Sequence, residues 1–237
     1  MWEVLKTAQH VSGVSSHVRI RKEAVASFSK RLHEGGIEVP PWSRTYHFCA
    51  GGRETVSYLL VLDSLNFCFW PASGESRWEI IWGSRRLSGY FALAGSLARA
   101  MNSGVPLIRA EYLARLSVEA LREILGGRGE LQLMEDRVRI LNELGHILLE
   151  RYNGEASGFV EAAAGSAEKL VGLLVKTLTS FRDVAEYLGQ RVYFYKRAQI
   201  FCADLYGAFE VDWALWNLVQ QEKFTSRPHH RIVIIFY

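Results

Sequence analysis

Two polar side chains stand between apolar runs in the first third of the chain. Segment 63–66, Asp-Ser-Leu-Asn, follows an aliphatic stretch and precedes the aromatic residues Phe67 and Phe69. A carboxylate and a carboxamide can together read the donors and acceptors of a heterocyclic base, and aromatic rings can stack on its face. The alternative is a polar turn in which Asp63 and Asn66 bond to nearby backbone, and composition alone favours that simpler interpretation.

A second polar cluster lies further along, where Lys196 and Arg197 are followed by Asp204. On an α-helix, Lys196, Ile200 and Asp204 share one face because they are four residues apart. The two cations could hold a phosphate group. The alternative, a solvated basic surface at the start of a helix, is the more common outcome.

A third group of side chains occupies 212–217, Asp-Trp-Ala-Leu-Trp-Asn. Helical spacing pairs Asp212 with Trp216 and Trp213 with Asn217, so one side of a helix could offer an acid and an indole to a ligand. The alternative is an amphipathic helix that packs both tryptophans in the core. His47 stands alone, and a lone histidine is more often structural than catalytic.

Sequence motifs of other chemistries do not occur. There is no dinucleotide-binding glycine motif, phosphate-binding loop, nucleophile elbow or zinc-protease motif. Cys49, Cys68 and Cys202 are widely spaced, and the pair at 229–230 is two histidines with no partner at metal spacing. We therefore expect no metal ion, and free thiols favour a cytoplasmic location.

Composition indicates a globular domain. The chain has 237 residues, of which 49% are hydrophobic, enough for one domain with a sizeable core. No run of about 18 apolar residues predicts a membrane span, and the first residues do not resemble a signal peptide. The net charge of +3 is spread along the chain. It suggests anionic ligands but is too small for a nucleic-acid-binding face.

Hydrophobic spacing predicts a largely helical α+β domain with a small sheet from the first third. Asp63 is expected in a turn that faces the Lys196 helix. Ser117 is the expected N-cap of one helix. The predicted helices cover 20–32, 89–101, 118–125, 134–152, 166–178, 193–209 and 211–219, and the predicted strands 55–62, 67–70, 78–82 and 231–237.

Several short motifs, in this order, resemble one protein family. They are Asp63–Trp70 (D-S-L-N-F-C-F-W), Ser88–Tyr90 (S-G-Y), Gly104–Pro106 (G-V-P), Arg139–Glu143 with Ile147–Glu150, Ser166–Leu170, Phe181–Asp183, and Phe194–Ile200 with Ala203–Asp204. The sequence is similar in these segments to the queuosine-salvage proteins, which are queuosine 5′-phosphate N-glycosylases/hydrolases. The resemblance implies a helical fold like that of the helix-hairpin-helix DNA glycosylases.

The resemblance is interrupted at Glu210. There the family carries a segment with F-A-D-Y, whose aspartate is taken as the catalytic carboxylate, and a later E-x-R motif. Here Glu210 is followed almost directly by 212–217 and 228–232, which resemble the family's last motifs D-Y-x-L-W-D and P-x-H-R-I-R. We interpret this as an internal deletion in a single domain spanning 1–237. Residues 1–210 match the family's N-terminal part and 211–237 its C-terminal end.

The resemblance implies hydrolysis of the N-glycosidic bond of queuosine 5′-phosphate, which releases queuine for tRNA modification without a cofactor. Breaking that bond develops positive charge on the sugar, which a carboxylate can stabilise. It also implies a monomer that acts on a small molecule and binds no nucleic acid. The motifs place His47, Asp63, Asn66, Asp212, Trp213 and Asn217 at the substrate, and Lys196 and Arg197 at its phosphate.

Two motif positions depart from the family. Residues 48–50 differ from the family's H-E-L-N after His47, and Asn217 replaces an aspartate. Asp204 is not assigned the catalytic role, because it matches an aspartate within the helix. The alternatives are a catalytically impaired isoform and a binding or regulatory protein. A DNA glycosylase would rest on fold analogy alone.

Overall fold

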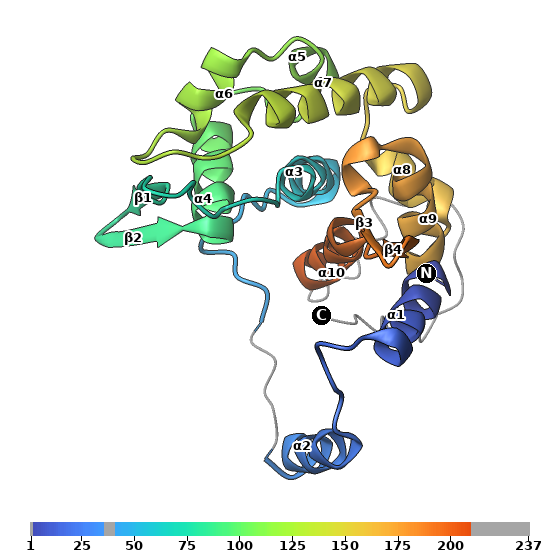
Figure 1. Ribbon diagram of the computed structural model, residues 1–237. Coiled ribbons are helices and arrows are strands. Elements are labelled where there is room, and N and C mark those ends of the chain that lie inside the picture. The colour runs from blue at the N-terminus through green and yellow to red at the C-terminus, as the bar shows by residue number, and fades with distance from the viewer. Residues whose placement is uncertain (1, 36–40, 210–237) are drawn as a thin grey trace.

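The computed structural model describes residues 2–35 and 41–209 and is mostly helical, with two small antiparallel sheets (Figure 1). The α+β class is therefore confirmed. The elements are α1 (Trp2–Val14), α2 (Lys22–Gly35), α3 (Gly52–Ser64), β1 (Glu79–Trp82), β2 (Arg85–Ser88), α4 (Gly89–Asn102), α5 (Ala110–Leu113), α6 (Val118–Leu125), α7 (Met134–Arg151), α8 (Ser157–Ala163), α9 (Ala167–Thr177), the 3₁₀ turn η1 (Thr179–Phe181), β3 (Val184–Tyr187), β4 (Gln190–Tyr193) and α10 (Lys196–Phe209).

Helix α3 is the centre of the core. Every side chain from Thr55 to Ser64 is buried, and α3 contacts α4, α7, α8 and α10. Figure 1 shows it end-on with those helices around it. The predicted strand 55–62 is therefore wrong. A helix that is covered on all sides lacks the polar positions that reveal helical spacing, so its apolar run also fits a buried strand.

The first hairpin was predicted in part. Strands β1 and β2 pair antiparallel with Trp82 opposite Arg85, and the connecting turn at 83–84 is where the sequence placed it. The predicted strand 67–70 is wrong, because no strand forms there. The sheet in the first third of the chain is thus this hairpin alone.

The second hairpin, β3–β4, was not predicted. Its two-residue turn consists of Leu188 and Gly189, whose φ angles are 49° and 76°. Two consecutive positive φ angles match the right-handed twist of a hairpin, but leucine is an unusual residue for the first of them. The sequence therefore gave no turn signal, and the predicted helix at 193 begins at Lys196 instead.

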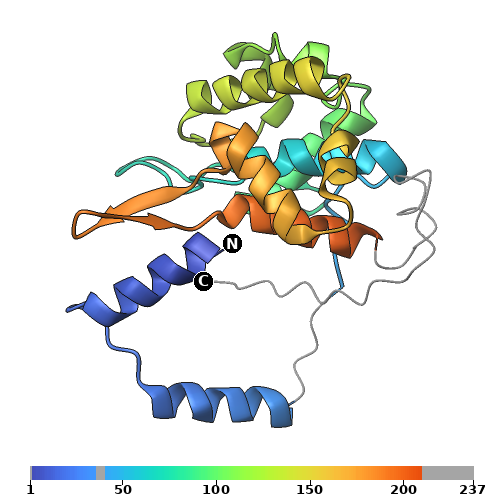
Figure 2. The same cartoon turned by 90° about the vertical axis from the view of Figure 1, so that its right-hand side faces the viewer.

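Four of the remaining helices, α4, α6, α7 and α9, follow the predicted ranges closely. The Ser117 hydroxyl accepts a hydrogen bond from the Ala120 amide at 3.2 Å and caps α6, as expected. Helix α2 forms too, although none of its residues is buried, and Figure 2 shows it below α1 and away from the other helices. Helices α1, α5 and α8 were not predicted. The helix expected at 211–219 and the strand at 231–237 lie outside the described residues.

None of the helices in the described ranges is long and apolar enough to cross a membrane.

Candidate functional site

Helices α3 and α10 pack together and bring the first two polar clusters into contact. Arg197 on α10 donates a hydrogen bond to the Ser64 carbonyl at 3.2 Å, across 133 positions in the sequence. Its guanidinium also lies 4.9 Å from the centre of the Phe67 ring. The expected juxtaposition of Asp63 with the Lys196 helix is therefore present, although Asp63 lies in the last turn of α3 and not in a loop after a strand.

Asp63 is a buried acid whose carboxyl oxygens form no hydrogen bond of good geometry within the described ranges, although the Asn66 side chain is close enough to favour its ionised form. Its side chain is fully buried, and both carboxyl oxygens are unpaired there. Burial raises the pKa of Asp63 well above its ordinary value, and the charge of Asp204 adds to the rise, while Asn66, Lys196 and Arg197 oppose it. An unpaired buried carboxyl costs stability, and such groups gather at functional sites.

Arg137 on α7 fixes the segment that follows Asp63. The guanidinium is fully buried and donates to the carbonyls of Leu65 at 2.7 Å, Phe67 at 2.6 Å and Cys68 at 3.0 Å. It lies 4.3 Å from the centre of the Phe67 ring, and burial lowers the pKa of Arg137 to about 10. These bonds use the carbonyls that a strand would have paired, which explains why no strand forms at 67–70.

Asp204 is the centre of a hydrogen-bond network that joins three parts of the chain. Tyr90, in the first turn of α4, bonds Oδ2 of Asp204 through its hydroxyl at 2.9 Å. Trp42 donates its indole N–H to Oδ1 at 3.2 Å. The same Tyr90 hydroxyl is 2.8 Å from Nε2 of His47, and Nδ1 of His47 bonds the Ser43 carbonyl.

Burial shifts the titration of both ends of this network. It lowers the pKa of His47, which the Ser43 carbonyl and the charge of Asp204 oppose. Burial also raises the pKa of Asp204. The hydrogen bond with Tyr90, the charge of His47 and the hydrogen bond from Trp42 act in the opposite direction. The pKa of Tyr90 is also raised, again chiefly by burial. Both shifts favour the uncharged forms of the two side chains, and the rise in the pKa of Asp204 brings that carboxyl closer to the range that general acid–base chemistry near neutral pH uses.

Gly207 makes room for Trp42 on the surface of α10. A Cβ atom at position 207 would lie 2.7 Å from Cβ of Trp42, closer than such atoms approach one another. Trp42 also stacks on the His47 ring, with centroids 4.4 Å apart. The absence of a side chain at Gly207 therefore supports the placement of both the indole and the imidazole.

Gly207→Ala is expected to displace Trp42 and to lower the free energy of unfolding by about 1–3 kcal/mol. The matched control is Gly172→Ala on α9, where a Cβ atom meets nothing within 4 Å. That variant is expected to gain up to about 1 kcal/mol, because alanine favours a helix. Urea unfolding measures both, and tryptophan fluorescence reports the movement of Trp42. Equal effects of the two substitutions would contradict the packing role of Gly207.

The structure brings together four of the residues selected from the sequence. His47, Asp63, Asn66 and Arg197 lie in or beside the network around Asp204, and Asn66 is buried next to Asp63. Lys196 is exposed, and its backbone N–H donates to Asp183 at 2.7 Å. The other three candidates, Asp212, Trp213 and Asn217, lie outside the described residues.

Sequence reasoning missed Trp42, Tyr90 and Arg137 as parts of the site. Tyr90 was noticed only within the S-G-Y motif, and Trp42 gave no signal because its partner Asp204 is 162 positions away. Arg137 is one of several charged residues in α7, and spacing alone did not reveal that it is buried.

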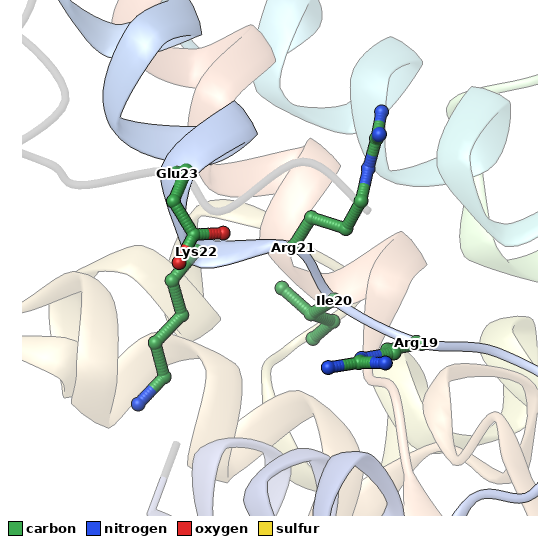
Figure 3. Close-up of a pocket in the computed structure, with 5 residues that line it drawn as sticks. All are labelled: Arg19, Ile20, Arg21, Lys22 and Glu23. Carbon is green, nitrogen blue, oxygen red and sulfur yellow. The ribbon is translucent and has the colours of Figure 1, made fainter.

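A separate hollow lies where the chain enters α2, lined by residues 19–23. Figure 3 shows that the side chains of Arg19, Arg21 and Lys22 point in different directions and do not converge. None of the candidate residues lies there.

Comparison with known proteins identifies the family. The family model described as queuosine salvage protein matches residues 46–211. The queuosine 5′-phosphate N-glycosylase/hydrolase of Sphaerobacter thermophilus is 44% identical over 207 residues, which are 87% of this chain and 63% of the relative. The proteins of the same name from Mus musculus and Dictyostelium discoideum are 35% and 34% identical, over 86% and 87% of this chain and 62% and 64% of their own lengths.

This chain thus spans slightly less than two thirds of the length of these relatives. Within the part that matches, the family model covers α3, the Arg137 contacts and α10, the elements that form the candidate site. The chain belongs to the queuosine salvage protein family.

Proposed function

We propose that the site between α3 and α10 binds queuosine 5′-phosphate, and that the reaction it serves is hydrolysis of the N-glycosidic bond with release of queuine. The names of the relatives support this proposal. The observation that carries it is Asp63, a fully buried acid with no partner among the described residues, beside the start of α10. Such a group is available to a ligand.

The chemistry of the site fits the two ends of that substrate. Queuine carries an amine side arm that is cationic at neutral pH, and buried carboxyl groups such as Asp63 and Asp204 attract a cation strongly. Asn66 supplies a further polar contact to the base, whereas His47, whose two ring nitrogens bond Ser43 and Tyr90, acts on the pocket through Tyr90. A cationic ligand would also favour the ionised form of Asp63 and so offset the cost of burying it.

The phosphate is assigned to the start of α10. Lys196 is exposed there, and Arg197 next to it keeps donors beyond the one that bonds Ser64. The backbone N–H of Lys196 already donates to the Asp183 carboxylate, so the two side chains carry the assignment. The distance between this end and Asp63 is bridged by the nucleotide in our proposal, with the base towards α3.

A second candidate function is binding without efficient turnover. It is favoured by the length of the chain, which covers 62–64% of the relatives above, and by the absence of the F-A-D-Y segment. We propose that residues 1–237 form one domain of the helix-hairpin-helix glycosylase type with a deletion after Glu210, in which Asp212, Trp213 and Asn217 complete the base pocket. We further propose that it acts as a cytoplasmic monomer on the free nucleotide.

Titration calorimetry tests the binding proposal. Queuosine 5′-phosphate is expected to bind at least about tenfold more tightly than guanosine 5′-phosphate, a difference of about 1.4 kcal/mol, because guanosine lacks the cationic arm. Asp63→Asn is expected to remove most of that preference. Asp136→Asn is the matched control, since Asp136 is an exposed acid on α7 that pairs with Arg139. Equal affinity for the two nucleotides would refute the proposal.

A further inference from the structure

The hydrogen bonds of His47 fix the position of one proton. The Ser43 carbonyl oxygen can only accept, so Nδ1 of His47 must carry hydrogen. The state of the other ring nitrogen, Nε2, then depends on the Tyr90 hydroxyl 2.8 Å away. That hydroxyl has one hydrogen to donate and two neighbours, His47 and Asp204.

Two proton arrangements satisfy both bonds of Tyr90. In the first, Tyr90 donates to an ionised Asp204, so that Nε2 must donate to the Tyr90 oxygen and His47 is a cation. In the second, a protonated Asp204 donates to the Tyr90 oxygen, and Tyr90 donates to Nε2 of a neutral His47. Both contain the same number of protons and the same total charge, zero.

The arrangements differ only by two short proton movements. The Asp204 proton passes to the Tyr90 oxygen while the Tyr90 proton passes to Nε2 of His47, or the reverse. Each O–H or N–H bond that breaks is matched by one that forms, and no other reactant takes part. We propose that Tyr90 links His47 and Asp204 into a proton relay, a single unit that holds one transferable proton on either His47 or Asp204.

The aromatic surroundings of the relay limit its contact with solvent. Trp42 covers one face of His47 and occupies the second oxygen of Asp204, and the Tyr58 ring meets His47 edge-on at 6.4 Å. Asp63 is the charged neighbour from α3, and its own charge is opposed by Lys196 and Arg197 on α10. Burial lowers the pKa of His47 and raises that of Asp204, which favours the neutral arrangement at rest.

The use of the proton rests on the proposed function. A reaction that breaks an N-glycosidic bond must deliver a proton to the departing base and remove one from the attacking water. Both ring nitrogens of His47 are bonded within the protein, so Asp204 is the end that exchanges a proton with a reactant. A proton that Asp204 gives up is replaced from His47 through Tyr90, and a proton that it takes up passes to His47 by the same route. Tyr90 is a positioning residue in this scheme, and His47 and Asp204 are the groups that gain or lose charge.

Nuclear magnetic resonance of the ligand-free full chain tests the relay. With nitrogen-15-labelled histidine and carbon-13-labelled aspartate, the Nε2 signal of His47 and the carboxyl signal of Asp204 are expected to change at the same pH, as in a coupled pair. In Tyr90→Phe the two titrations are expected to separate by more than about one pH unit. His47→Gln and Asp204→Asn assign the signals.

The matched control is Tyr58→Phe, which also removes one hydroxyl beside His47, one that bonds the Ala94 carbonyl instead. It is expected to leave the shared titration unchanged. Identical His47 titrations in the native chain and in Tyr90→Phe would overturn the relay. If Tyr90→Phe does not fold, Asp204→Asn decides, because the relay requires the pH at which His47 titrates to shift in that variant, and an unshifted His47 would overturn it.

This titration tests the relay independently of the proposed function, because the sample contains no nucleotide. A shared titration in a protein that does not bind queuosine 5′-phosphate would support the relay and refute the proposed ligand. Tight binding with independent titrations would do the opposite.

Discussion

The purified chain is expected to release queuine from queuosine 5′-phosphate at least about 100-fold more slowly than the Sphaerobacter thermophilus relative. The reason is our proposal that the segment in which the family resemblance places the catalytic carboxylate is deleted after Glu210. Removal of a main electrostatic stabiliser of the transition state commonly costs a factor of about 10² to 10³ in rate. The measurement is the initial rate of queuine release at saturating substrate, with folding verified by circular dichroism.

The matching gain-of-function experiment inserts the corresponding segment of the relative after Glu210. The insertion is expected to raise the rate of queuine release at least about tenfold, because α3, α4 and α10 already form the candidate site. If the native chain is as fast as the relative, the interpretation of the deletion is wrong. Asp63→Asn and Asp212→Asn would then show which carboxylate performs the work.

Asp63→Asn is expected to make the protein more stable at neutral pH, although our proposal also expects it to weaken the binding of queuosine 5′-phosphate. The pKa of Asp63 is raised by folding, so the folded chain keeps a proton that the unfolded chain releases above its ordinary pKa of 3.8. The free energy of unfolding therefore falls by about 1.4 kcal/mol for each pH unit between that value and the folded pKa. The amide of the variant cannot ionise, so its free energy of unfolding does not fall in this way as the pH rises.

Urea unfolding at several pH values between 5 and 8 measures the effect. The stability advantage of Asp63→Asn over the native chain should grow as the pH rises until the folded pKa is passed, and then stay constant. Asp136→Asn, on the exposed face of α7, should follow the native pH dependence throughout. A constant difference between Asp63→Asn and the native chain across this range would show that burial does not shift the titration of Asp63.

The sequence predicted those helices that have a polar side or a clear cap. Ser117 and Ser166 cap α6 and α9 with their hydroxyl groups, and both helices begin where the sequence indicated. Helix α3 was misread as a strand because burial on all sides removes the contrast on which periodicity depends. The Leu188-Gly189 turn was missed because leucine rarely takes a positive φ.

The site was predictable only where chemistry and motif coincided. Asp63 and the cations of α10 were selected from the sequence, and α3 packs against α10 as expected. The roles of these residues at a substrate stay predictions. The network around Asp204 was not predicted, because Trp42 and Tyr90 are separated from Asp204 by 162 and 114 positions in the sequence. Contacts over such separations depend on how α4 and α10 pack, which spacing along the chain does not encode.

Trp42 and Ser43 lie before the region that the family model matches, yet both take part in the candidate site. The region that the family model matches begins at Tyr46, whereas the partners of Asp204 and His47 begin four residues earlier, at Trp42. A protein shortened to that region would keep every residue that the model matches, yet it would lose the indole that covers Asp204 and the carbonyl that holds the His47 proton. The family model therefore marks less of the chain than the architecture of the site requires.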